Sequence, residues 1–145
     1  MIRFLTALLF VSALLASSSK LVAGDAVAIG YNENGIWTGV TYYCSSKPKG
    51  AKDYKTENGA REEAMRDLRR RSAYAATTVK ILSSSDSTGF VALARGHDQA
   101  GRDFHGVGRG KSQMEADKKA FELLNQAGAS AEEKIVYRYF SYGSK

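Results

Sequence analysis

The sequence predicts an α+β fold in which two β-β-α-β repeats form a mostly antiparallel sheet packed against two helices. Two apolar, strand-like runs, Val27-Ala28-Ile29 and Val91-Ala92-Leu93, each begin a stretch with the same order of patterns. Each stretch also contains small apolar residues four positions apart, a spacing that places them on one face of a helix. The 145 residues favour one compact domain, so we expect repeat 1 (26–83) and repeat 2 (90–140) to share a core.

Residues 1–24 are predicted to be a secretory signal peptide that precedes the domain over 25–145. The segment has a basic start at Arg3, an apolar run over 4–16 and small residues up to Gly24, in the order that a signal peptidase substrate shows. The run is too short to span a bilayer. A buried core helix is the alternative. We therefore expect a secreted or periplasmic protein that does not span the membrane.

Each repeat is predicted to begin with a β-hairpin. In repeat 1 the chain turns at Asn34-Gly35 and returns over 36–40, and in repeat 2 it turns at Gly101 and returns over 102–107. Asn-Gly is a strong hairpin signal because both residues tolerate positive φ angles. The two hairpins therefore occupy matching places in the repeats.

A helix is predicted after each hairpin, with a narrow stripe of small residues along one side. Alanine at these positions allows a helix to lie close against a sheet, and polar residues fill the other positions. The stripes are Ala60, Ala64 and Leu68 in repeat 1, and Ala116, Ala120 and Leu124 in repeat 2.

Each repeat is predicted to close with a strand, over 78–82 in repeat 1 and over 134–140 in repeat 2. The segment 45–57 of repeat 1 has the composition of an exposed loop. The serine-rich segment 83–89 is expected to be a polar connector between the repeats.

The string HGVGRGKS over 105–112 is similar to a nucleotide-binding phosphate loop. Such a loop needs a glycine five positions before Gly110, where this chain has His105. It also follows a parallel strand, whereas this string follows the return strand of a hairpin. We therefore predict no nucleotide and no cofactor. Ser112 and Glu115 fit a helix capping box instead, and the glycines are expected to let the strand end and turn into the helix.

Basic residues form the candidate site for an anionic partner. Four arginines crowd the end of the first helix, and two cations flank the start of the second helix, where a helix N-terminus attracts anions. The loop over 45–57 contains four lysines, three of which are candidates. Cations at a helix C-terminus also suit the helix dipole, so an ordinary charged surface is the alternative. The candidates are Arg66, Arg69, Arg70, Arg71, Lys47, Lys49, Lys52, Arg109 and Lys111.

Histidine and aspartate flank the second hairpin turn and are the candidates for metal binding or catalysis. His97, His105, Asp98 and Asp103 are ligand types that zinc accepts. Aspartate is also common in turns, so we predict surface hairpin residues and no metal site. A hydrolase would need these side chains to converge in a concave site. No nucleophile motif is present, and we assign no catalytic residue.

Cys44 is the single cysteine of the chain, so no intramolecular disulfide is possible. It is predicted to be a small, partly buried residue on a strand, and a disulfide-linked dimer is the alternative. Loss of Arg3 and Lys20 with the leader lowers the formal net charge from +6 to +4. This mildly basic balance favours association with polyanions.

Several short segments resemble the small secreted bacterial family known as domain of unknown function 4189. Residues 26–31 (AVAIGY) resemble its first strand, and residues 90–94 (FVALA) resemble its second "GALA" strand. Residues 108–112, followed by Glu115-Ala116 and Ala120, are similar to its second helix start, and 135–137 to its closing strand. The cysteines common in that family are missing here. The resemblance implies an exported, compact α+β protein of bacterial origin without a transferable enzymatic activity.

These patterns predict an exported, non-enzymatic binding protein. Its partner is expected to be a protein, or an anionic glycan or lipid of the cell envelope, bound through the basic residues. A hydrolase of envelope polymers and an inhibitor of an extracellular enzyme are the alternatives. The tyrosine-rich last strand could also hold a glycan or a peptide, although aromatic residues in strands usually pack.

Overall fold

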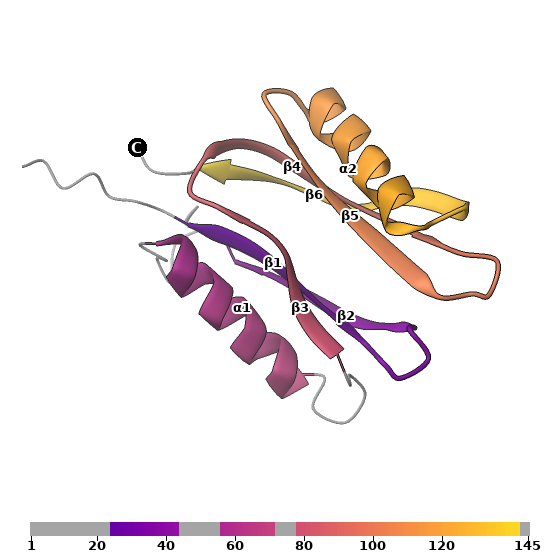
Figure 1. Cartoon of the computed structure of the whole chain (residues 1–145). Coiled ribbons are helices and arrows are strands. Elements are labelled where there is room, and N and C mark those ends of the chain that lie inside the picture. Colours follow the sequence, from indigo (N-terminus) through magenta and orange to yellow (C-terminus); the bar gives the residue numbers. More distant parts are fainter. Residues whose placement is uncertain (1–23, 44–55, 72–77, 143–145) are drawn as a thin grey trace, which may run out of the picture.

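The computed structural model describes residues 24–43, 56–71 and 78–142 and consists of two modules with the same order of elements (Figure 1). The N-terminal module contains β1 (Asp25–Tyr31), β2 (Trp37–Tyr43), α1 (Glu57–Arg71) and β3 (Thr78–Ser85). The C-terminal module contains β4 (Thr88–His97), β5 (Asp103–Gly110), α2 (Gln113–Ala127) and β6 (Ala131–Tyr142). The predicted α+β class and the β-β-α-β order are confirmed. The predicted signal peptide, the lysine loop and Cys44 lie outside the described residues.

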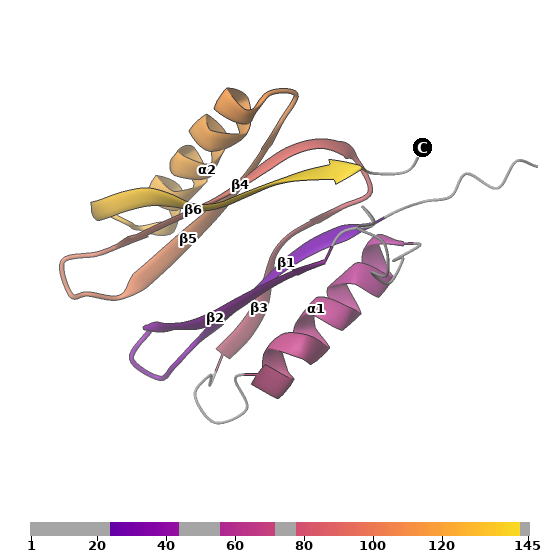
Figure 2. The same cartoon turned by 180° about the vertical axis from the view of Figure 1, so that it is seen from behind.

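The strands form two antiparallel three-stranded sheets, ordered β2-β1-β3 and β5-β4-β6, where the sequence suggested one sheet. The sheets pack face to face, with α1 on the outer face of the first and α2 on the outer face of the second (Figures 1 and 2). The molecule therefore has four layers in the order helix, sheet, sheet, helix. In each sheet the first strand of the module is central, because both other strands pair with it.

The two hairpin turns are built in the same way. In the first, the Asn32 carboxamide oxygen accepts hydrogen bonds from the backbone N–H groups of Asn34 and Ile36. In the second, the Asp98 carboxylate accepts from the N–H groups of Ala100 and Arg102. A glycine with positive φ follows in both turns, at +75° in Gly35 and +77° in Gly101. These Asx-type turns fix the register of both hairpins.

The alanine stripes pack against the outer faces of the two sheets, as predicted. All six stripe residues are buried, and they contact the alternate residues of β1 and β4 that point outward. These strand residues are also small: Ala26 and Ala28 in β1, and Ala92 and Ala94 in β4. Small residues on both surfaces bring helix and sheet backbones close together.

The opposite faces of the central strands form the core between the sheets. Val27 of β1 packs with Val91 and Leu93 of β4 and with Val107 of β5. Burying one aliphatic side chain of this size contributes about 1.5–3 kcal/mol. The alternation along each central strand therefore supplies two cores at once, one toward a helix and one toward the other sheet.

The glycines of β5 have a different role from the one predicted. They do not end the strand, since β5 continues to Gly110. A Cβ on Gly106 would overlap the carbonyl oxygen of Ala120, and one on Gly108 would overlap that of Ala116. The missing side chains therefore let the backbone of α2 lie directly on β5. As a result, α2 packs mainly on β5 and β4, whereas α1 spreads over all three strands of its sheet.

The start of α2 confirms the predicted cap. The Ser112 hydroxyl accepts a hydrogen bond from the N–H of Glu115, and the Glu115 carboxylate accepts one from the N–H of Lys111. The helix ends at Gly128, which has φ +114°. The predicted polar connector over 83–89 is largely wrong, because β3 extends to Ser85 and β4 begins at Thr88. Serine side chains find partners within the strands there, as with Ser83 and Arg109.

Candidate binding groove

A polar cluster joins the two hairpin turns, and it contains the histidine and aspartate predicted for a surface hairpin. Asp103 is 7% exposed, and its carboxylate accepts hydrogen bonds from the Trp37 backbone N–H at 2.8 Å and from Arg95 Nε at 2.9 Å. The Arg95 guanidinium lies 4.8 Å from the centre of the Trp37 ring. The prediction of surface residues is wrong for Asp103, because packing of the two sheets covers this hairpin face.

His105 is also buried and lies beside Tyr31, whose hydroxyl is 2.9 Å from Nδ1 of the histidine. Burial lowers the pKa of His105 to about 4, with Arg95 and Lys80 acting in the same direction and Asp103 opposing them. Burial raises the pKa of Tyr31 to about 12, and Asp103 adds to this effect. Neither group has a pKa near neutrality, where general acid–base catalysis is most efficient. The arrangement suits a neutral hydrogen bond between the two sheets.

His97 lies across from Asp103 in the β4–β5 ladder, with its Nε2 3.4 Å from a carboxylate oxygen of Glu132. The backbone carbonyl of Asp98 and the Glu132 carboxylate raise the pKa of His97. In the part of the chain that the structure describes, no group of three or more His, Cys, Asp or Glu side chains is placed to hold a metal ion. Among the same residues, no helix is long and apolar enough to cross a membrane.

Arg109, one of the predicted anion-binding residues, points between the sheets. Its guanidinium donates to both carboxylate oxygens of Asp25, at 2.9 and 2.8 Å, and to the Ser83 hydroxyl at 2.9 Å. The Tyr139 hydroxyl also donates to Asp25, which is fully buried. Arg109 therefore binds a carboxylate of its own chain and connects β5 with β1 and β3.

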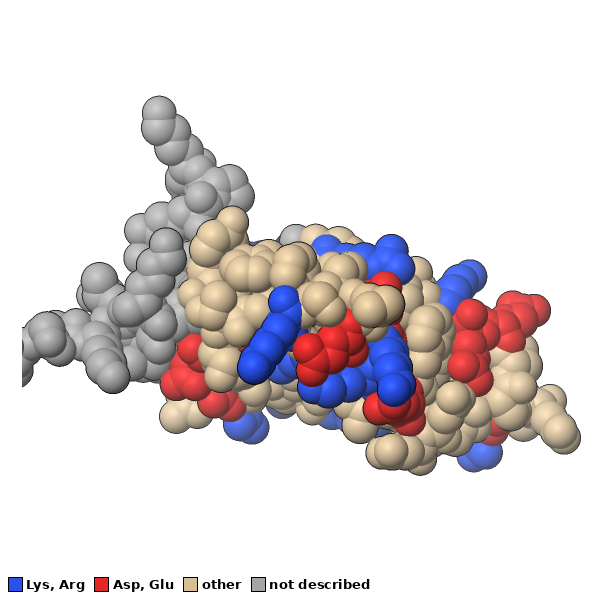
Figure 3. Space-filling model, turned by 90° about the horizontal axis from the view of Figure 1, so that it is seen from above, with Lys and Arg blue, Asp and Glu red and all other residues tan. Residues whose placement is uncertain are grey.

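Lys111 lies near the start of α2, where the surface carries both signs of charge. Figure 3 shows basic and acidic side chains interspersed over the face seen from the α2 side. Lys119 forms an ion pair with Glu115 at 2.7 Å, and Lys118 lies 3.8 Å from Glu122. The structure does not bring Arg109 and Lys111 together with the arginines of α1, because α1 and α2 lie on opposite outer faces (Figure 1).

The arginines at the end of α1 differ in their partners. Arg70 and Arg71 both contact the buried carboxylate of Asp67, at 2.7 Å each. Arg66 forms an ion pair with Glu63. Arg69 is exposed, and within the described residues it has no carboxylate partner. The predicted residues Lys47, Lys49 and Lys52 lie outside the described residues.

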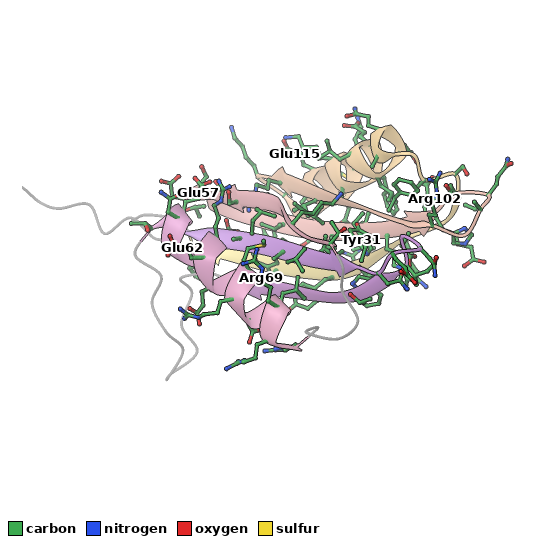
Figure 4. All side chains as sticks on the ribbon, turned by 60° about the horizontal axis from the view of Figure 1, so that its bottom comes forward. Tyr31, Glu57, Glu62, Arg69, Arg102 and Glu115 are labelled. Atoms are coloured by element: carbon green, nitrogen blue, oxygen red, sulfur yellow. The ribbon has the colours of Figure 1, made fainter. Side chains whose placement is uncertain are left out.

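A groove runs between α1 and the edge strand β3, and two of the predicted arginines, Arg66 and Arg69, line it. Its apolar part is formed by Met65 of α1 and Ile81 of β3. Figure 4 shows α1 with Glu62 and Arg69 labelled. The other four lining residues were not predicted from the sequence. The spacing of positions 61, 65 and 69, four residues apart along the helix, could have indicated two of them, Arg61 and Met65. The lining residues are Arg61, Glu62, Met65, Arg66, Arg69 and Ile81.

The equivalent surface of the C-terminal module is bridged by an ion pair. Ile81 pairs with Ala28 of β1, and Arg138 of β6 pairs with Ala92 of β4, so these two residues hold the same place in the two sheets. Arg138 reaches across to Asp117 of α2 with N–O distances of 2.9 to 3.2 Å. The alanine stripes place Arg61 of α1 where α2 has Asp117. The first module therefore has an arginine and an isoleucine where the second has a bridging ion pair.

No family model, curated protein or solved structure matches the chain. The resemblance to the domain of unknown function 4189 family therefore remains a prediction. The class of protein that the structure itself defines is a four-layer α+β domain with an open, basic groove along one helix.

Proposed function

We propose that this protein is an exported, non-enzymatic binding protein that holds an anionic partner in the groove between α1 and β3. The observation that carries the proposal is the groove itself, which combines an apolar centre with arginines at its rim. Arg61 is about half exposed and lies 3.7 Å from Glu57, a pair that contributes little in water. The guanidinium groups of Arg61 and Arg69 are therefore available to an anionic partner.

The distribution of charge elsewhere supports this choice of site. Arg109 is engaged by Asp25, Arg70 and Arg71 share Asp67, and the α2 face alternates between acids and bases. A partner at those places would have to displace an intramolecular carboxylate. At the groove, a partner reaches Arg61 and Arg69 by displacing water and the weak contact of Arg61 with Glu57, while Arg66 stays paired with Glu63 and Glu62 also lines the groove.

The test is binding of an anionic polymer, such as dextran sulfate, to the mature domain at increasing ionic strength. We expect binding to weaken as salt is added and to fall about tenfold in the double variant Arg61→Gln/Arg69→Gln, since two charge contacts are removed. Arg102→Gln is the matched control, because it removes one exposed arginine near the second hairpin turn, well separated from Arg69 (Figure 4). Binding that ignores salt and both groove arginines would reject the proposed function.

A further inference from the structure

We propose that the natural partner of the groove is an acidic peptide segment in extended conformation, which adds to the sheet as a new strand beside β3. This inference rests on the proposed function and adds the chemical class and the conformation of the partner. Three independent features of the groove lead to it: the apolar centre, the edge of β3 that no described strand pairs with, and the spacing of the arginines.

The apolar centre of the groove selects against a purely ionic polymer. Met65 and Ile81 are partly buried against the alanines of α1 and β1, and their remaining surface faces the groove. A sugar–phosphate or sulfated chain would leave the apolar surface of Met65 and Ile81 in contact with water, whereas an aliphatic side chain would bury it. A polypeptide can place apolar and acidic side chains next to one another along the same line.

The edge of β3 provides backbone partners for such a chain. Among the described strands, β3 pairs only with β1 and forms one edge of its sheet. Residues 78–81 pair one for one with β1, before a bulge near Leu82 interrupts the ladder. A strand that pairs on one side leaves every second N–H and C=O directed outward, and peptides bind to such edges by adding a strand. The regular edge is about 13 Å long, from four residues at about 3.3 Å each.

The spacing of the helix residues matches the repeat of a strand. Arg61, Met65 and Arg69 follow one another at intervals of four along α1, and all three line the groove. The two arginines are separated by eight residues, or about 12 Å along the helix axis. In an extended peptide, side chains on one face at positions i and i+4 are about 13 Å apart, with i+2 midway. The groove therefore fits an acid–x–apolar–x–acid sequence.

The test uses four synthetic peptides, two of equal composition and two that are N-methylated forms of the first, and measures their affinity for the mature domain. The first has Glu, Leu and Glu at positions i, i+2 and i+4, with Ser or Thr between them. The second has the two glutamates adjacent. The third and fourth are each N-methylated at one of two neighbouring residues of the first peptide. Successive N–H groups of a strand point to opposite edges, so only one of the two methylations blocks pairing with β3.

We expect the first peptide to bind at least about fivefold more tightly than the second, because only its two acids reach both arginines. One methylated form should lose binding and the other should keep it. Arg61→Gln/Arg69→Gln should weaken the first peptide about tenfold, and Arg102→Gln should leave its affinity unchanged. Chemical shift changes confined to α1 and β3 would confirm the place of binding.

Other results separate the inference from the proposed function. If dextran sulfate and all peptides bind alike, and the binding depends on Arg61 and Arg69, the groove is a polyanion site and the extended-peptide inference is overturned. Equal effects of the two methylations would also overturn strand addition. If no acidic peptide or polymer binds in an arginine-dependent way, the proposed function fails together with the inference.

Discussion

The N-terminal and C-terminal modules share their order of elements but differ in how the helix meets the third strand. In the C-terminal module, Arg138 of β6 binds Asp117 of α2 and bridges the space between strand and helix. In the N-terminal module the same places hold Ile81 and Arg61, and a groove remains. One architecture thus produces either a closed surface or an open one, depending on two side chains.

The modules also differ in where the helix lies on its sheet. Three outward positions of β5 are Gly106, Gly108 and Gly110, and they pair with Ala94, Ala92 and Phe90 of β4. The matching register positions of β2 are Gly39, Thr41 and Tyr43. Because all three places hold glycine, the backbone of α2 packs directly on β5. In contrast, α1 packs across all three strands of its sheet. The difference teaches that the smallest side chains decide which strand a helix covers.

Replacing Gly108 by valine should break the C-terminal module and have the largest effect. The added Cβ would overlap the backbone of α2 at Ala116, so the helix would have to move away from β5. We expect a loss of ~4 kcal/mol in the free energy of unfolding, or failure to fold. Urea denaturation followed by circular dichroism measures it. Gly59→Ala in α1 is the control, because its Cβ meets only the Thr56 hydroxyl at 3.3 Å and should be neutral or stabilising.

Replacing Asp25 by alanine tests how strongly the modules depend on each other. The carboxylate is fully buried, and its loss leaves the guanidinium of Arg109 largely buried without its anion. We expect a loss of about 3 kcal/mol in the free energy of unfolding. Removing the Lys118–Glu122 pair by Glu122→Ala should cost less than ~0.5 kcal/mol, since both side chains are exposed. A loss below about 1 kcal/mol for Asp25→Ala would contradict this role of the ion pair.

The contact between the hairpin turns should make stability depend on pH through His105. Its pKa is about 4 in the folded protein and about 6.5 in the unfolded chain, so the unfolded state binds the proton more readily. Stability is then fully present above about pH 6.5 and is lost as the pH falls toward 4. Between pH 7 and 5 we expect a loss of about 2 kcal/mol in the free energy of unfolding.

The variant His105→Asn keeps a polar side chain but does not titrate in this range. Urea denaturation of both proteins at pH 7 and pH 5 should show the loss in the wild type and little of it in the variant. His97, whose pKa is raised, adds stability as the pH falls, and it does so equally in both proteins. Aspartate and glutamate residues whose pKa values are lowered, such as Asp98, Glu115 and Asp117, act at lower pH and also affect both proteins equally. Parallel losses in wild type and variant would contradict the assignment to His105.

Exchanging the two groove positions between modules should have the smallest effect on stability and the clearest effect on binding. Asp117→Arg with Arg138→Ile gives the C-terminal module the residue pair of the N-terminal one, and we expect it to gain a second, weaker site for the acidic peptide. Arg61→Asp with Ile81→Arg should close the first groove and remove binding. The Arg138 and Asp117 side chains are 52% and 23% exposed, so exchanging them should change the free energy of unfolding by less than about 1 kcal/mol. In the N-terminal module the apolar stem of an arginine at position 81 can cover the surface that the partly buried Ile81 covers, so we expect a similarly small change there. Calorimetric titration measures the number of sites.

Much of the frame could be predicted from the sequence because it depends on local patterns. The alanines four apart, the glycine turns and the Ser112 cap each act over a few residues, and each has its predicted effect. The predicted ends of the strands were less accurate than the predicted order of elements. Residues 83–85 and 108–110 have compositions typical of loops, but pairing with β1 and β4 places them in strands.

The candidate site was only partly predictable. Arginines at the end of α1 were noticed from their number, and Arg66 and Arg69 do line the groove. Arg70, Arg71 and Arg109 looked the same in the sequence, but each binds a buried carboxylate. Whether an arginine is free depends on an aspartate that can be far along the chain. Arg109 and Asp25 are 84 positions apart, and no local pattern relates them.

The amino-acid sequence by itself determined the class of fold, the order of elements and the helix faces that pack, because these follow from periodicity and turn chemistry within short segments. Only the tertiary structure decided that the strands divide into two stacked sheets and that His105 and Asp103 become buried between them. It also decided that a groove opens between α1 and β3, whereas an ion pair bridges α2 and β6. Those outcomes depend on contacts between side chains of different layers. Such residues can be far apart in the sequence, so no local pattern shows that they will meet.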